Sequence, residues 1–364
     1  MLDATSQAAN WMGLCFNANK CAYLHNNGSR RDSVQATSFH IQGEPMISLE
    51  EGEAYQQLGK PTGFCIWQTL EDTIKEILQD ATKIETSLLV PWRKINALNT
   101  FLIPRISFVL RGSAVAKVPF NKVNSIIRQL VKRWLFLPQR ASNELTYIGH
   151  RQGGANVPRM GDLCDFAVIT QAFCLLTCAD ATMKNIAANA LGEVIKKRIS
   201  RIRSRQDIAT CFSSSLDGEF EWDGGDIASL WTHACNITRH LRKHIGCRWT
   251  WCEERQELSV LVPRIRATDH TIITPRAQGI LEKSLKAAIN ALYVENLKKK
   301  PDQGKAFEFT SKWDARNHFL PWGSFTRFAD WRFIHQAQLN CLPLNRAICH
   351  GNRDKGCRKC GYNN

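Results

Sequence analysis

The C-terminal end of the chain carries the residues best suited to hold a metal ion. Cys357 and Cys360 are separated by two residues and followed by a glycine, a spacing that opens many zinc knuckles. Zinc takes four ligands, and the residues after Cys360 include neither His nor Cys. Cys341, Cys349 and His350 are upstream candidates for the missing positions. The sequence therefore predicts either a zinc site completed from upstream or a half-site formed by Cys357 and Cys360.

A second set of potential ligands lies further upstream. It consists of two histidines and two cysteines, His240, His244, Cys247 and Cys252. Arginine and lysine residues crowd the same segment, and their positive charge opposes the binding of a dication. We therefore interpret this segment as the basic end of a helix with tryptophans beside it, rather than as a metal site.

Basic residues dominate the charge of the chain. Lys and Arg number 48 against 33 Asp and Glu, which gives a formal net charge of +15 and a pI near 9.3. An excess of this size favours polyanions, because each neutralised phosphate releases condensed counterions. The alternative is a basic protein with an ordinary solvated surface, so the placement of the charges has to decide.

Two groups of basic residues are the candidates for phosphate contacts. The first lies on a predicted helix over 120–137, away from its apolar stripe. The second ends a helical stretch at 196–205, where six of ten residues are basic. A plain solvated helix face remains the alternative for both groups. The candidate residues are Lys122, Arg128, Lys132, Arg133, Lys196, Lys197, Arg198 and Arg201.

Several catalytic signatures are missing from the sequence. It contains no Asp-Asp pair, no Gly-x4-Gly-Lys-Ser/Thr phosphate loop, no His-Glu-x-x-His zinc helix and no Gly-x-Ser-x-Gly elbow. No run of 18 apolar residues predicts a membrane span. The cysteines fall mostly within apolar helical stretches, so we expect nearly all of them to be reduced core residues.

Helical periodicity dominates after residue 63. Apolar residues recur at steps of three and four and predict successive helices over 70–88, 91–102 and 120–137. Pro104 should kink or end the second helix. A longer helix over 278–297 should stop at the Lys-Lys-Lys-Pro-Asp-Gln-Gly breaker of 298–304.

The front of the chain, to about residue 67, is mixed. Strand-like runs occur at 20–25, 39–43 and 55–59, separated by turn residues. The predicted fold class is therefore mainly α with a small α+β front.

Six segments, in order along the chain, resemble segments of LINE-type reverse transcriptases, the polymerases of non-LTR retrotransposons. They are Gly-Leu-Cys-Phe-Asn-x-x-Lys-Cys at 13–21, Tyr-x-x-Leu-Gly-x-Pro-Thr-Gly at 55–63, Pro-Trp-x-Lys-Ile-x-Ala-Leu-x-Thr-Phe-Leu-x-Pro-Arg at 91–105, Arg-Trp-Leu-x-Leu-Pro at 133–138, Gly-Gly-x-x-Val-Pro at 153–158 and Cys-x-x-Cys-Gly at 357–361. Each segment is weak alone, and their shared order carries the resemblance. The group it is most similar to inserts into specific sites in ribosomal DNA.

The resemblance implies a division of the chain. Residues 1–68 would be the C-terminal part of a reverse-transcriptase palm, and 69–140 a helical thumb. Residues 141–350 would be a helical linker region, and 351–364 the truncated start of a CCHC zinc knuckle. The hairpin that positions the primer end would include Tyr55, Leu58 and Gly59.

The resemblance also implies a function. In the family, the aspartates of an Ala-Asp-Asp loop hold Mg²⁺ for RNA-directed DNA synthesis. That loop would lie just upstream of Met1, so we expect this chain to bind RNA or an RNA–DNA hybrid through its backbone without copying it. We expect no membrane partner, zinc only if the knuckle is completed, and a nuclear location for the parent protein.

Two alternatives stay open. Instead of a binding fragment, the chain would be a slice of a complete, active reverse transcriptase and endonuclease, or a decayed relic that never folds stably. Asn156 departs from the family, which usually has a small residue there, and this puts the close backbone approach at that loop in doubt.

Overall fold

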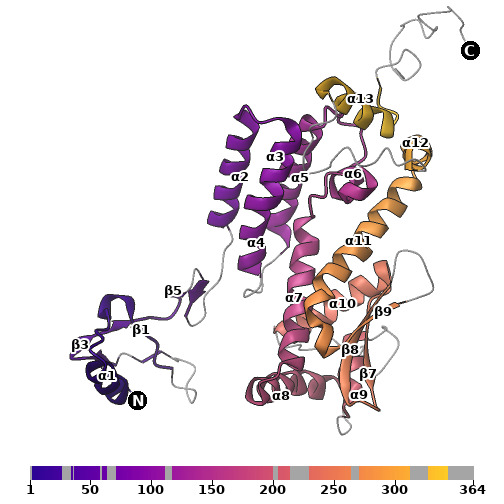
Figure 1. Ribbon diagram of the computed structural model, residues 1–364. Helices are drawn as coiled ribbons and strands as arrows, with labels where there is room; N and C mark the ends of the chain where they lie inside the picture. The colour runs from indigo at the N-terminus through magenta and orange to yellow at the C-terminus, as the bar shows by residue number, and fades with distance from the viewer. Residues whose placement is uncertain are drawn as a thin grey trace, which may run out of the picture. The chain divides into compact units, whose positions relative to one another are not determined.

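The computed structural model describes residues 2–26, 34–35, 37–57, 60–63, 71–110, 117–199, 204–213, 229–263, 270–311 and 327–342 of the chain. Contacts divide the chain into two compact units, Met1–Leu70 and Glu71–Asn364. The second unit contains the longer helices and most of the buried apolar residues (Figure 1).

The first unit combines one helix with short paired strands. α1 (Leu2–Trp11) and a 3-10 turn (Ala18–Lys20) precede β1 (Ala22–Tyr23), β2 (His40–Ile41), β3 (Glu44–Pro45), β4 (Ile47–Ser48), β5 (Tyr55–Gln57) and β6 (Lys60–Thr62). β1 and β4 pair in parallel, whereas β2–β3 and β5–β6 are antiparallel. Strands thus form inside all the predicted runs, although each has only two or three residues.

The first unit buries few apolar side chains. Ala9, Ala18, Ile41 and Leu49 form its core within the described residues, while Trp11 at the end of α1 is 88% exposed. Because stability grows with buried apolar area, the described residues of this unit contribute little hydrophobic stabilisation.

The second unit begins with a group of helices. They are α2 (Glu71–Thr86), α3 (Pro91–Ala97), a π-helical segment (Leu98–Leu102), α4 (Ile103–Leu110) and α5 (Val118–Trp134). Ile77 of α2, Leu98 of the π segment and Ile127 of α5 are almost fully buried, as the helical periodicity predicts. Pro104 does not end its helix. Instead, the chain widens to π geometry in the turn just before it, where a regular α-helix would set the proline ring against a carbonyl.

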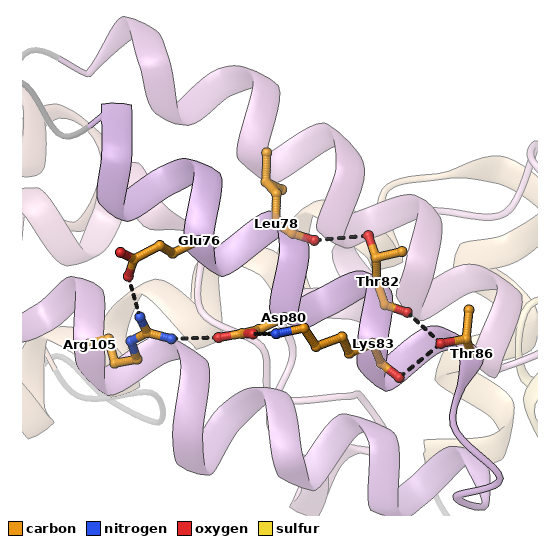
Figure 2. A network of polar contacts seen from close by, with 7 residues as sticks. All are labelled: Glu76, Leu78, Asp80, Thr82, Lys83, Thr86 and Arg105. Atoms are coloured by element: carbon orange, nitrogen blue, oxygen red, sulfur yellow. Dashed lines mark hydrogen bonds and ion pairs between the residues drawn. The ribbon is translucent and has the colours of Figure 1, made fainter.

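Polar contacts tie α2 to α4 on the outside of this group. Arg105 of α4 reaches Glu76 and Asp80 of α2 at 2.6 and 2.7 Å, and Lys83 binds Asp80 at 2.8 Å (Figure 2). The hydrogen bond from Lys83, and then that from Arg105, lowers the pKa of the Asp80 carboxyl. Exposed ion pairs of this kind add little stability. In this arrangement, however, both Lys83 and Arg105 are already paired with carboxylates.

α7 (Met160–Thr177) is the central helix of the second unit. It contacts α4, α5, α8 (Ala181–Arg198), α10 (Leu230–Ile245) and α11 (Leu281–Lys298). By length and composition alone, α7 is apolar enough to cross a membrane. More than half of it is buried against other elements, as in the core helix of a soluble protein, so this likeness is weak.

A three-stranded sheet interrupts the region that the sequence analysis expects to be helical. β7 (Arg248–Cys252), β8 (Glu257–Pro263) and β9 (His270–Ile273) form an antiparallel meander beside α9 (Gln206–Ser213). Trp249 of β7 stacks on Phe212 of α9 with ring centroids 4.4 Å apart, and its Nε1 donates to Thr238 Oγ1 of α10 at 2.9 Å. Tryptophan burial therefore joins the sheet to the helices.

The C-terminal part of the described chain is helical. A 3-10 segment (Pro275–Ile280) leads into α11, followed by α12 (Pro301–Ser311) and α13 (Phe328–Gln338). The predicted break after α11 is present but short, and Pro301 then starts a new helix, a position where its missing N–H costs nothing. Trp331 of α13 is buried and packs edge-on against Trp92 of α3.

Trp134 gives a test of this packing. Its ring is 4% exposed, and its Nε1 donates to the Glu85 carboxylate of α2. We expect Trp134→Ala to lower the free energy of unfolding by about 3–5 kcal/mol, because the substitution leaves a cavity. Chemical denaturation measures the change. The control Phe101→Ala removes a 67% exposed ring and should change stability by less than about 0.5 kcal/mol. Equal stability of the two variants would contradict the packing.

Candidate nucleic-acid site

The Gly-Gly-x-x-Val-Pro segment forms a tight crossing of the backbone over α6 (Glu144–Tyr147). The amide of Ala155 donates to Leu145 O at 3.0 Å, that of Asn156 to Ile148 O at 2.8 Å and that of Val157 to Thr146 O at 2.9 Å. A Cβ on Gly154 would lie 2.2 Å from Ile148 O, which no side chain tolerates. Glycine at this position is therefore a steric requirement.

Two further residues of this crossing adopt left-handed backbone conformations. Gly153 has φ +81°, and a Cβ there would lie 2.5 Å from Gln338 Nε2 of α13. Asn156 has φ +54°, a region that asparagine enters more readily than most residues. The departure from a small residue at Asn156 therefore leaves the close backbone approach intact.

The crossing forms one wall of a cavity of about 470 Å³. The other walls come from the π segment, α4, α7 and α11, and both α4 and α11 contact α7 (Figure 1). Its polar lining includes Asn99, Asn156, Arg159, Asp162, Asn290 and Tyr293. A volume of this size falls within the range of small-ligand sites.

A buried hydrogen bond fixes one side of the cavity. Tyr293 Oη of α11 donates to Asp162 Oδ2 of α7 at 2.5 Å, and the Tyr293 ring lies 4.9 Å from that of Tyr147. Burial raises the pKa of Asp162, although the hydrogen bond from Tyr293 and the charge of Arg159 oppose the shift. Burial and the neighbouring Asp162 raise the pKa of Tyr293, so its hydroxyl stays a proton donor.

The basic residues predicted on α5 have different environments. Lys122 is exposed, and Arg133 is exposed but lies 3.2 Å from Glu85 of α2. Arg128 is half-buried, and its charge acts on the Tyr147 hydroxyl. The prediction that Lys132 faces phosphates is corrected, because this residue is only 8% exposed. Its ammonium donates to Gln139 O and Ala141 O, at 3.0 and 2.6 Å. Burial, and then the charge of Arg128, lowers its pKa.

The second basic group divides in the same way. Lys196 and Lys197 are exposed in the last turn of α8. Arg198 is 6% exposed, so the expectation that it faces phosphates is corrected. Arg201 lies outside the described residues. The accessible cations therefore lie on α5 and at the end of α8, which are separate parts of the second unit in Figure 1.

The predicted metal and hairpin residues are only partly described. Cys357 and Cys360 lie outside the described residues, as do Leu58 and Gly59. Tyr55 lies on β5, where its hydroxyl donates to Lys20 O, and the β5–β6 hairpin pairs Tyr55 with Thr62.

Of the upstream zinc-ligand candidates, Cys341 lies within the described residues. Its side chain is buried, and burial raises the pKa of its thiol, which disfavours the thiolate that zinc needs. Within the described residues, which include His240, His244, Cys247 and Cys252, no group of three potential ligands that could hold an ion is found. Cys247 is buried and behaves as a core residue.

Comparisons with known proteins add a relationship. No family model matches the chain. Over 166 residues, 44% of the chain, the sequence is 30% identical to the Retrovirus-related Pol polyprotein from a type-2 retrotransposable element of Drosophila melanogaster. The chain is related to non-LTR retrotransposon proteins. The match spans only 15% of the Drosophila polyprotein, so the activity of that whole protein does not transfer with it.

A second relative is similar along nearly all of the chain. An uncharacterized protein of Caenorhabditis elegans is 22% identical over 355 residues, which are 91% of this chain and 95% of that protein. The similarity to the Caenorhabditis elegans protein therefore extends over nearly the whole of both sequences.

Sequence reasoning missed the polar lining of the cavity. Asn99 and Tyr293 stand as polar residues within helical patterns, and Arg159 follows Pro158 in a loop. Ordinary surface positions have the same appearance in a sequence. The Gly-Gly-x-x-Val-Pro motif signalled a tight loop but not the cavity beside it.

Gly154 provides a test of the crossing. We expect Gly154→Ala to destabilise the protein by about 1–3 kcal/mol, because the added methyl group meets backbone atoms that cannot move aside. The matched control is Gly161→Ala at the start of α7, where a Cβ meets nothing within 4 Å and stability should hold or rise slightly. Denaturant-induced unfolding measures the stability of both variants. Equal stability would show that the crossing is looser than described.

Proposed function

We propose that this chain binds RNA or an RNA–DNA hybrid through the phosphate backbone and does not itself polymerise DNA. The observation that carries the proposal is the 30% identity to a retrotransposon Pol polyprotein. The net charge of +15 supports it, because polyanion binding gains free energy from counterion release.

Accessible, uncommitted cations are the residues that would contact phosphates. Lys122 on α5, with Lys196 and Lys197 on α8, fits this description. Arg133 can bind phosphate only in competition with Glu85. Lys132 is held by carbonyl groups of the turn that follows α5. Contacts from these helices would track the backbone without reading base sequence, as suits a protein that handles many sequences.

The aspartates of α7 support the part of the proposal that assigns no polymerisation to this chain. Two-metal phosphoryl transfer needs carboxylates that are ionised and open to Mg²⁺. Asp162 and Asp165 lie one turn apart on α7, but burial raises the pKa of both. Tyr293 already donates to one oxygen of Asp162, and Lys117 pairs with one oxygen of Asp165. These aspartates therefore do not fit a magnesium site, and our proposal assigns the chain a binding role.

Zinc is a separate part of the proposal. Cys357 and Cys360 would supply two thiolates, and further ligands would have to come from other residues. Such a knuckle would add a second nucleic-acid contact beyond the helices described above.

The salt dependence of binding tests the phosphate contacts. We expect the affinity of the chain for a labelled single strand, measured by fluorescence anisotropy, to fall with rising salt. The double variant Lys196→Ala, Lys197→Ala should make the log–log slope shallower by about 1.4, because two phosphate contacts are lost.

The control for this test is Lys83→Ala, which removes an exposed lysine that is already bound to Asp80. It should leave the slope unchanged. A wild-type slope near zero would refute the proposal, and equal slopes for all three proteins would remove Lys196 and Lys197 from the interface.

A further inference from the structure

We propose that the 470 Å³ cavity between α4, α7, α11 and the Gly154 crossing binds one unpaired nucleobase of the bound strand. This inference rests on the proposed function, since it names the part of the nucleic acid that the second unit recognises. It adds a base site to a protein whose other contacts are to phosphates.

A buried acceptor without a donor lies in the π segment, on a residue that lines this region. Asn99 lines the cavity, and its Nδ2 donates to Ala155 O at 3.3 Å. Its Oδ1 is buried, and no group within the described residues donates to it. A buried acceptor without a donor is costly, so it marks a place where a ligand donor is missing. π turns inside helices are frequent at functional sites, and this one places Asn99 at the cavity.

Carboxamides from three separate elements line the cavity. Asn99 comes from the π segment, Asn156 from the crossing and Asn290 from α11. A carboxamide presents one acceptor and one donor group, which is the pattern on the edges of nucleobases. Asn156 contributes from a left-handed conformation with φ +54°.

Electrostatics favours a neutral group in the interior over a phosphate. Lys286 is paired with Glu282 at 2.7 Å, and the charge of Arg159 acts on Asp162 beside it. Each cation of the lining therefore has an anion next to it. Apolar residues such as Ile103, Phe166 and Ile289 complete the walls and suit the face of a planar ring.

A base site requires bases that are free of pairing, which suggests a direct experiment. The full chain is titrated with a fluorescein-labelled single strand and with the same backbone carrying abasic residues throughout. The two probes have the same charge, so phosphate contacts contribute equally to both. We expect the wild-type protein to prefer the strand with bases by about tenfold, the effect of a single recognised base.

Two variants assign the preference to the cavity. Asn99→Leu and Asn290→Leu each remove a carboxamide while keeping similar volume, and either should reduce the preference to near parity. Asn290 is on a helix, where leucine is favourable, so that variant should fold even if the first does not. Asn96→Leu is the matched control, because Asn96 is exposed one turn from Asn99 and does not line the cavity. It should retain the full preference.

The outcomes separate this inference from the proposed function. Strong, salt-dependent binding of both probes without a preference would overturn the base site and leave the phosphate interface standing. A preference that survives both cavity variants would also overturn it, since the bases would then bind elsewhere. Absence of binding to either probe would overturn both proposals.

Discussion

The second unit depends on the approach of Gly154 to the carbonyl of Ile148. No side chain fits between these two backbone segments, and the hydrogen bonds on either side of them hold Ala155 and Val157 in the core. The crossing also anchors its neighbours, because Asn99 of the π segment donates to Ala155 O and Gln338 of α13 lies against Gly153. Several elements far apart in sequence therefore meet at one short loop.

The cavity is a consequence of that constraint. Once the crossing is fixed, α7 and α11 are joined across it by the buried bond between Asp162 and Tyr293. The helices then leave a space that the available side chains do not fill. The same architecture divides the basic residues into those that hold the fold together, such as Lys132, and those that remain open to a polyanion, such as Lys196.

The sequence predicted features that depend on local periodicity. The apolar stripes of α2 and α5 recur at helical spacing, so the burial of Ile77 and Trp134 could be foreseen. The burial of Lys132 could not be foreseen, because the carbonyl groups that bind it belong to the turn after α5. The chain changes direction in that turn at Phe136, which has φ +54°. The sequence analysis did not predict the β7–β9 sheet, because it assigned the whole surrounding region to helices. The alternation of apolar residues within β8 was given less weight than that helical pattern. The cavity needed tertiary contacts that no sequence pattern contains.

Photo-crosslinking of the full chain to a strand containing 4-thiouridine, followed by mass spectrometry of the linked peptides, tests the central claim most directly. That claim is that nucleic acid binds the second unit at the cavity and at the exposed lysines. The account predicts cross-links in the π segment, in the 153–159 crossing and near Lys196 and Lys197. Cross-links confined to other surfaces, with these peptides unmodified, would contradict it.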